Sequence, residues 1–206
     1  LEAHHLSTHL TQRAKIAQAV NTLKFENNGI SGDNTDGAGL IRDIESNLGV
    51  SIAARRILLL GAGGAARGVI LPLLQQNPAL LAIVNRTPHK AEALQQQFTS
   101  HGPIVAGDLM AFPDEKFDII INATSASLHN ALPQIPASIF SHAALAYDMM
   151  YSHELTHFLK FAQLHGAQRL ADGIGMLVEQ AAESFFIWRG IYPQTKPVIT
   201  MLKSRL

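Results

Sequence analysis

A strand–turn–helix stretch around residue 60 constrains the fold of this chain more than any other feature. The apolar run from Ile57 to Leu60 shows no alternation of apolar and polar residues, which is typical of a parallel strand covered on both faces. Gly61, Gly63 and Ala66 then match the pattern G-x-G-x-x-G/A, whose small residues allow a tight turn, the approach of a pyrophosphate and close helix packing. The free N–H groups and the dipole of the following helix favour an anion at its start. The stretch predicts a dinucleotide-binding turn; the alternative is a strand-to-helix turn that binds no ligand.

The end of the next expected strand indicates which dinucleotide binds. Residues 79–84 are apolar and lead into Asn85-Arg86-Thr87. An NAD site usually has an acidic residue at this point, which accepts a hydrogen bond from the ribose 2'-hydroxyl. This chain instead has Arg86, with Lys90 four residues later. Because the planar donors of arginine suit a phosphate, we predict NADP; the alternative is that Arg86 is a solvated surface side chain.

From Arg56 onward, strand-like runs alternate with helical patterns. Crossover helices between parallel strands produce a doubly wound sheet, so we predict an α/β, Rossmann-like fold with the strand order 3-2-1-4-5-6. The expected strands cover residues 56–60, 79–85, 103–106, 117–122, 144–148 and 168–171. The expected helices between them include residues 88–98, where Thr87 and Pro88 form a typical start, and residues 154–164, with Gly166 as the stop.

The two ends of the chain carry different patterns. Residues 1–20 look helical, and Asn28-Gly29 is a strong signal for a two-residue hairpin. A last long helix begins near Asp172-Gly173, and a short helix bounded by Pro193 and Pro197 ends the chain. The apolar stripe expected on the long helix consists of Met176, Leu177, Ala181, Phe185 and Trp188.

Polar residues in both end segments are candidates for ligand binding. Residues 32–37 are dense in groups that hydrogen-bond hydroxyls, although Asp36 could instead cap the helix that follows. Gln180 places an amide on the inward side of the long helix, where a polar group needs a partner. That partner is either backbone or a ligand hydroxyl.

Composition excludes several classes of function. Lys plus Arg and Asp plus Glu both number 16, so there is no basic surface of the kind that nucleic acid requires. Cysteine is absent, which excludes disulfides and thiolate metal sites and fits the cytoplasm. No apolar run approaches the roughly 20 residues of a membrane span. His4, His5 and His9 have no acidic partner at ligand-like spacing, so we expect a solvated helix face and no metal.

Several short motifs, each modest alone, together resemble the shikimate dehydrogenase family, NADP-dependent enzymes of aromatic amino-acid biosynthesis. They occur in one order around the expected Rossmann core and span nearly the whole chain. The motifs are Ala19-Val20-Asn21-Thr22, Gly32-Asp33-Asn34-Thr35-Asp36, Gly61-Ala62-Gly63-Gly64-Ala65, Asn85-Arg86-Thr87, Asn122-Ala123-Thr124-Ser125, Tyr147-Asp148-Met149-Met150-Tyr151, and Asp172-Gly173-Ile174-Gly175-Met176-Leu177 with Gln180.

The resemblance implies reversible reduction of 3-dehydroshikimate to shikimate, on the way to chorismate. It also implies a smaller α/β substrate domain built from both ends of the chain, residues 1–36 and 173–206, with the NADP-binding domain, residues 37–172, inserted between them. The expected ligands are therefore NADP and shikimate or 3-dehydroshikimate, with no nucleic acid and no membrane. The expected location is cytoplasmic, and a homodimer is one expected assembly.

The resemblance also assigns roles to individual residues. Asp36 matches the catalytic aspartate, which works with a lysine, and the substrate-binding positions are Asn21, Asp36, Tyr151 and Gln180. The pyrophosphate turn corresponds to Gly61, Ala62, Gly63, Gly64 and Ala65. The 2'-phosphate site corresponds to Asn85, Arg86 and Thr87, with Lys90 beside it. The positions near the nicotinamide and its ribose are Thr124, Ser125, Met149 and Gly173.

Two departures from the family pattern affect the expected activity. The family's serine pair and catalytic lysine have no match among these residues, and Lys15 and Lys24 do not lie in that motif. We therefore expect a fragment or processed product that binds NADP and turns over shikimate poorly. Ser127 stands where the family usually has glycine.

Three alternative functions are compatible with parts of this sequence. A quinate or dual quinate/shikimate dehydrogenase shares the scaffold, but those that prefer NAD tend to carry an acid where Arg86 stands. A catalytically silent NADP-binding module would fit the missing lysine motif. A glutamyl-tRNA reductase-like domain would share the glycine turn, but it gives no reason for residues 32–36, and this chain has no cysteine nucleophile.

Overall fold

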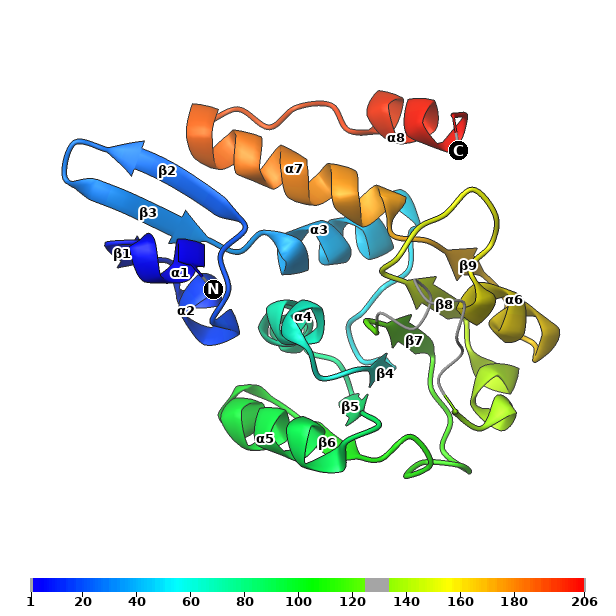
Figure 1. Cartoon of the computed structure of the whole chain (residues 1–206). Helices are drawn as coiled ribbons and strands as arrows, with labels where there is room; N and C mark the ends of the chain where they lie inside the picture. Colours follow the sequence, from blue (N-terminus) through cyan, green and yellow to red (C-terminus); the bar gives the residue numbers. More distant parts are fainter. Residues whose placement is uncertain (1, 125–133, 206) are drawn as a thin grey trace.

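The larger of two sheets has the predicted order of strands. A computed structural model describes residues 2–124 and 134–205 (Figure 1). Its six-stranded sheet runs β6-β5-β4-β7-β8-β9, and every neighbouring pair is parallel, so the predicted order 3-2-1-4-5-6 is confirmed. The strands are β4 (Arg56–Leu60), β5 (Leu80–Val84), β6 (Ile104–Gly107), β7 (Ile119–Asn122), β8 (Leu145–Asp148) and β9 (Leu170–Ala171).

Helices cover both faces of this sheet, which explains the uninterrupted apolar strands. On β4, Ile57 and Leu59 pack into one hydrophobic cluster, whereas Leu58 and Leu60 pack into the cluster on the opposite face. The first cluster is completed by α3 (Asp36–Arg42), which continues as a π-helical turn (Asp43–Asn47), α4 (Gly64–Gln75) and α5 (Pro88–Phe98), which ends in a 3-10 turn (Thr99–His101). The second is completed by a 3-10 helix (Ala137–His142) and α6 (His157–Leu164).

The N-terminal segment is not one helix, so that prediction is wrong. It consists of α1 (Glu2–Leu6), the two-residue strand β1 (His9–Leu10) and α2 (Gln12–Ala17). The strand forms because it pairs in parallel with β3 (Gly29–Asp33), a contact that local helical pattern cannot reveal. Thr11 then caps α2, because its hydroxyl accepts a hydrogen bond from the N–H of Ala14.

The predicted hairpin is present, with its turn one residue earlier than expected. β2 (Thr22–Glu26) pairs antiparallel with β3, and the pairing of Glu26 with Gly29 leaves Asn27 and Asn28 as the loop. Gly29 has a φ of +139°, which glycine adopts readily and other residues rarely do. The smaller sheet therefore has the order β1-β3-β2.

On the long C-terminal helix, α7 (Ile174–Arg189), Met176 of the predicted apolar stripe is buried, but the other residues of the stripe are not. Phe185 and Trp188 are 42% and 50% exposed, whereas Glu179 is only 3% exposed. The cause is close backbone packing, because α7 runs along α3 (Figure 1). A Cβ added to Gly39 of α3 would lie 2.7 Å from the carbonyl oxygen of Met176. The contact between helices is thus set by glycine and by buried polar groups, which a count of apolar positions does not detect.

Two helix starts also differ from the predictions. α6 begins at His157, three residues later than expected, because Thr156 caps it by accepting from the N–H of Leu159. The last helix, α8 (Lys196–Lys203), contains Pro197 in its first turn, whereas the prediction had Pro193 and Pro197 as its bounds.

We predict that Gly39→Ala lowers the free energy of unfolding by about 1–3 kcal/mol, because the methyl group would force α3 away from the α7 backbone. Urea unfolding measures the change. Gly64→Ala is the matched control: a Cβ there meets nothing within 4 Å, so its stability should stay at or slightly above that of the wild type. Equal stability of the two variants would show that the two helices do not depend on this contact.

Candidate functional site

The glycine turn after β4 combines one glycine that the fold requires with two that it does not. Gly61 has a φ of +111°, and a Cβ there would lie 3.2 Å from the carbonyl oxygen of Ala123. By contrast, a Cβ on Gly63 or Gly64 would meet nothing within 4 Å. Gly63 is the N-cap of α4, has an ordinary φ of −85° and offers no side-chain cap. The open space and the uncapped helix start fit an anion that approaches the backbone here.

The neighbouring positions of the turn agree with this arrangement. Ala62 is half-buried and Ala65 is exposed, so neither side chain blocks the helix start. Ala66 is fully buried between α4 and the sheet, as its small size predicts.

The predicted 2'-phosphate residues follow β5, at the edge of the sheet where the glycine turn follows β4. The Asn85 side-chain amide donates to the carbonyl oxygen of Thr87 at 2.9 Å, which closes the loop before α5. Arg86 and Lys90 are exposed, and within residues 2–124 and 134–205 neither forms an ion pair. Both cations are therefore available to a phosphate that binds beside the start of α5.

The carboxyl ends of β7 and β8 are joined by a buried polar network. Asn122 donates to Asp148 at 3.0 Å and accepts from the N–H and the hydroxyl of Thr124 at 3.1 and 2.7 Å. Asp148 also accepts from the Thr156 hydroxyl at 2.6 Å. The network fixes Thr124 next to the glycine turn, since a Cβ on Gly61 would lie 3.2 Å from Thr124 Cγ2. Ser125, predicted beside it, and Ser127 lie outside the described residues.

Met149 and Gly173 are brought together, as their shared assignment requires. A Cβ on Gly173 would lie 2.1 Å from the Met149 carbonyl oxygen, so only glycine allows this approach. The N–H of Gly173 donates to the carbonyl oxygen of Met150 at 3.1 Å. The end of β8 is thereby tied to the start of α7.

Asp36 is the first residue of α3 and lies between the two halves of the candidate site. Its Oδ1 accepts from the Asn21 amide at 2.7 Å, and its N–H donates to Asn34 Oδ1 at 3.2 Å. The N-cap of α3 is Thr35, so the alternative that Asp36 caps this helix is wrong. On the side of α4, a Cβ on Gly68 would lie 3.2 Å from Asp36 Oδ2.

Burial controls the protonation of this carboxylate. Desolvation raises the pKa of Asp36 above its ordinary value, while hydrogen bonds from Asn21 and Asn34 act in the opposite direction. A carboxyl group with a raised pKa beside a helix that is predicted to bind a cofactor is suited to proton exchange.

Gln180 has an unused hydrogen-bond acceptor. Its Oε1 is buried and has no hydrogen-bond partner in the described part of the chain. The predicted alternative, that backbone satisfies this amide oxygen, is therefore not met. A Cβ on Gly39 would lie 2.8 Å from the Gln180 backbone N, so Gln180 sits against the same helix that begins with Asp36. A ligand hydroxyl fits this oxygen.

Tyr151 is the least constrained of the predicted substrate residues. It follows β8, is 44% exposed, and forms no hydrogen bond with the described residues. Lys24 is paired with Glu26 at 3.0 Å and Lys15 is exposed, so neither lysine takes the place of the family's catalytic lysine.

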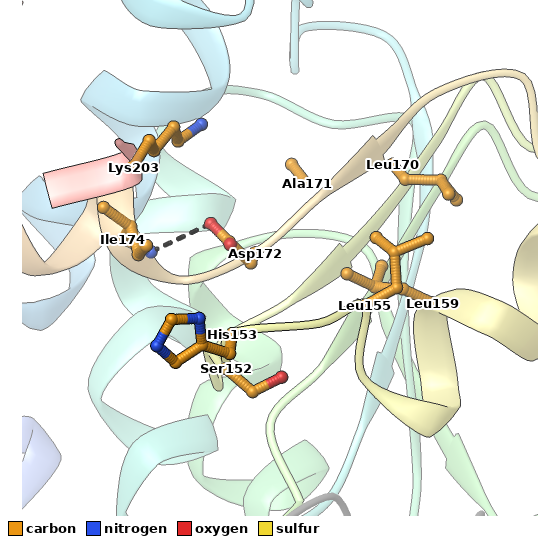
Figure 2. Close-up of a pocket in the computed structure, with 9 residues that line it drawn as sticks. All are labelled: Ser152, His153, Leu155, Leu159, Leu170, Ala171, Asp172, Ile174 and Lys203. Atoms are coloured by element: carbon orange, nitrogen blue, oxygen red, sulfur yellow. Dashed lines mark hydrogen bonds between the residues drawn. The ribbon is translucent and has the colours of Figure 1, made fainter. Parts of the chain in front are cut away.

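A pocket of about 270 Å³ lies at the β9 edge of the large sheet (Figure 2). Leu155, Leu159 and Leu170 line one side of it, and Asp172 accepts from the N–H of Ile174 on the other side at 3.2 Å. None of the predicted site residues lines this pocket. It adjoins the candidate site, because Asp172 and Ile174 flank Gly173 and Ser152 follows Tyr151.

Sequence reasoning assigned no role to several residues that shape the site. Gly68 allows α4 to approach Asp36, and Asn34 holds the Asp36 backbone. Thr22 and Thr35 contact the Asn21 amide oxygen, and Ser184 contacts both of these hydroxyls. In the sequence, the density of polar residues at 32–37 was the only sign of this group. The contribution of Ser184 could not be predicted, because it lies in a distant helix.

Two further findings concern metal binding and membrane-spanning helices. Among the residues described, no group of three His, Asp or Glu side chains could hold a metal ion. No helix of the described segments is long and apolar enough to cross a membrane.

Comparison with known proteins identifies the family. A family profile described as "Shikimate / quinate 5-dehydrogenase" matches residues 43–133, and one described as "Shikimate 5'-dehydrogenase C-terminal domain" matches residues 173–200. The shikimate dehydrogenase (NADP(+)) of Nitrosospira multiformis is 62% identical over 206 residues, which are all of this chain and 75% of that protein.

Two solved structures show the same fold. An Ael1 enzyme from Pseudomonas putida has a TM-score of 0.93 and 50% identity, covering 98% of this chain and 74% of that one. Shikimate 5-dehydrogenase from Thermus thermophilus, solved with NADP(H) and shikimate, has a TM-score of 0.85 and 28% identity, covering 100% of this chain and 75% of that one. With the profiles and the identity to curated relatives, these matches show that the chain belongs to the shikimate dehydrogenase family.

Proposed function

We propose that the protein is an NADP-dependent shikimate dehydrogenase, which reversibly reduces 3-dehydroshikimate to shikimate. One observation carries the proposal: the Asp36 carboxylate lies between the Asn21 amide and the backbone of α4 at Gly68, the helix that starts at the glycine turn. A group that handles the substrate proton is thus held beside the helix that would hold the cofactor.

On the substrate side, three polar groups would recognise hydroxyls. Asn21 and Asp36 offer a hydrogen-bonded amide and carboxylate, and Gln180 offers its buried, unused oxygen. A site that hydrogen-bonds substrate hydroxyls discriminates strongly against analogues without them, because its polar groups would be left unpaired. Tyr151, exposed after β8, would lie toward the substrate carboxylate, as the family resemblance implies.

On the cofactor side, the chain offers donors for each anionic part of NADP. The start of α4, with Gly61, Gly63 and Gly64, would hold the pyrophosphate, flanked by Ala62 and Ala65. Arg86 and Lys90 would bind the 2'-phosphate beside Asn85 and Thr87. Thr124, Met149 and Gly173 would lie near the nicotinamide and its ribose, with Ser125 next to Thr124. NADP supplies the hydride acceptor when it is bound.

The protein's own task in the reaction is to position the substrate and to handle one proton. Oxidation of a secondary alcohol releases the hydroxyl proton, and a carboxylate within hydrogen-bonding reach accepts it. We assign this role to Asp36, whose orientation is set by Asn21. The family pairs this aspartate with a lysine, for which these residues offer no match.

The organisation of the chain is also part of the proposal. Residues 1–36 and 173–206 would form the substrate domain, and residues 37–172 the NADP-binding domain. This division is supported by the small sheet, which lies within the first segment, and by the contact of α7 with β2.

Location and assembly are two finer proposals. A cytoplasmic location fits the biosynthetic role of the family. A homodimer is supported by exposed apolar side chains at the end of α7 and just after it: Phe185, Trp188 and Ile191.

We predict that this chain binds NADP much more tightly than NAD, and that Arg86→Gln removes most of the difference. Loss of charge-assisted hydrogen bonds worth about 1.5–3 kcal/mol should weaken NADP binding roughly tenfold to a hundredfold and leave NAD binding unchanged. Titration calorimetry measures both affinities, and Arg169→Gln, at another exposed arginine, is the control. If NADP and NAD bind equally well to the wild type, the cofactor assignment is wrong. Binding of NADP without any effect of shikimate would favour a silent NADP-binding module for these residues alone.

We predict a second effect in the protein that contains these residues. Burial raises the pKa of Asp36, so turnover, which needs the charged carboxylate, should fall with decreasing pH at values above the ordinary aspartate range near pH 4. Asp36→Asn should lower kcat by roughly a hundredfold or more while NADP affinity is retained. The exposed Asp114→Asn is the control. Unchanged turnover in Asp36→Asn would remove Asp36 from the mechanism.

A further inference from the structure

Three buried hydroxyl groups from distant parts of the chain meet beside Asn21. They belong to Thr22 in β2, Thr35 before α3 and Ser184 in α7, and we refer to them as the hydroxyl cluster. Ser184 Oγ lies 2.6 Å from Thr22 Oγ1 and 3.3 Å from Thr35 Oγ1. All three side chains are at most 9% exposed, so water does not readily replace these contacts.

Two members of the cluster contact the oxygen of the Asn21 amide. Asn21 Oδ1 lies 3.0 Å from the backbone N of Thr35, 3.1 Å from the Thr35 hydroxyl and 3.0 Å from the Thr22 hydroxyl. Because a backbone N–H can only donate, the amide atom that faces it must be the oxygen. The NH₂ group therefore points the other way and donates to Asp36 at 2.7 Å.

The same cluster connects this amide with the helix that carries Gln180. Ser184 lies one turn after Gln180 and donates to the Gln180 carbonyl oxygen at 3.0 Å. Each hydroxyl has one proton: Thr22 and Thr35 both donate to Asn21 Oδ1, and Ser184 shares its proton between Thr22 Oγ1 and the Gln180 carbonyl oxygen. Asn21, Asp36 and Gln180 are thus held relative to one another through these hydroxyls.

We propose that Thr35 is a positioning residue of this enzyme: with the hydroxyl cluster, it holds the Asn21 amide so that this amide donates to Asp36. The inference deepens the proposed function, because it takes from it the role of Asp36 in the reaction. Thr35 acts through Asn21 and need not touch the substrate itself.

The surroundings of Asp36 make it a sensitive reporter of this arrangement. Within the described residues, no charged side chain forms an ion pair with Asp36. On α4, Arg67 donates to Gln18 at 2.7 Å. On α7, Glu183 is bound by Arg13 and Arg42 at 3.0 and 2.8 Å. The hydrogen bond from Asn21 is thus one of the few interactions that favour the charged form of Asp36.

The test compares Thr35→Val with Thr35→Ser in the ligand-free chain. The valine variant keeps the shape and the backbone N–H but loses the hydroxyl, so the Asn21 amide should loosen and the pKa of Asp36 should shift upward. The serine variant should restore the wild-type titration. Carboxyl ¹³C NMR of Asp36 over a pH series measures this directly, without turnover. Ser184→Ala, which removes a neighbour of Thr35, should shift the titration in the same direction and serves if the valine variant does not fold.

A matched control separates positioning from general loss of stability. Tyr147→Phe also removes a buried hydroxyl, which donates at 2.7 Å to Asp43, at the other end of α3 from Asp36. This variant should leave the Asp36 titration unchanged. An unchanged titration in Thr35→Val, or an equal shift in Thr35→Ser or Tyr147→Phe, would overturn the proposal. In the protein that contains these residues, Thr35→Val should also lower kcat several-fold with the KM for NADP unchanged.

A failure of the proposed function would be seen in a different measurement from a failure of this inference. If the protein does not bind NADP or shikimate, ligand titrations show it, while the Asp36 titration in the free chain still decides whether Thr35 orients Asn21.

Discussion

The close approach of α3 to both α4 and α7 is the constraint on which the rest of this structure depends. Three glycines permit it. A Cβ on Gly37 would lie 2.1 Å from Pro72 of α4, one on Gly39 would lie 2.7 Å from the α7 backbone, and one on Gly68 would meet Asp36. Since α3 begins with Asp36, α4 begins at the glycine turn and α7 carries Gln180, these contacts bring the chemistry of three distant segments together. The site is a consequence of how closely three helix backbones pack.

Buried polar groups fix the arrangement that the glycines permit. Glu183 of α7 is bound by Arg42 of α3 and by Arg13, which also pairs with Asp33 of the small sheet. At the other end of the contact, Asp43 accepts from Tyr147 and Asn47. Partly desolvated pairs of this kind add little net stability, but removing one partner leaves the other charge buried and unpaired, which is strongly destabilising. We therefore expect them to define how α3 and α7 align more than how tightly they associate.

The sequence predicted the features that depend on local pattern and missed those that depend on distant partners. The strand at 56–60 and the sheet order were confirmed, because a parallel strand covered on both faces leaves an unbroken apolar run. β1 was missed because two residues form a strand only by pairing with β3. The buried face of α7 was only partly predicted: Met176 is buried, but Phe185 and Trp188 are exposed, and Gly39 of α3 and the buried Glu179 could not be read from apolar spacing.

The residues of the candidate site also fall into those that local motifs predicted and those that depend on distant partners. Short motifs located Asp36, Asn21 and the glycine turn, since each depends on neighbours in the chain. The hydroxyl cluster was not predictable, because Ser184 lies 149 residues from Thr35 and a lone serine in a helix has no signature. Likewise, nothing local distinguishes Gly68 from any other helical glycine until α3 is seen against it.

The position of Gly68 has a consequence for how the two halves of the site work together. Because the α4 backbone covers Asp36 Oδ2, the helix that would bind the cofactor pyrophosphate also desolvates the carboxylate that would take the substrate proton. Desolvation weakens the charged form, and the Asn21 and Asn34 amides strengthen it, so the protonation of Asp36 depends on a balance between the two sides. A change in the distance between α3 and α4 would alter that balance directly. The packing that assembles the site therefore also sets the proton affinity of its acid.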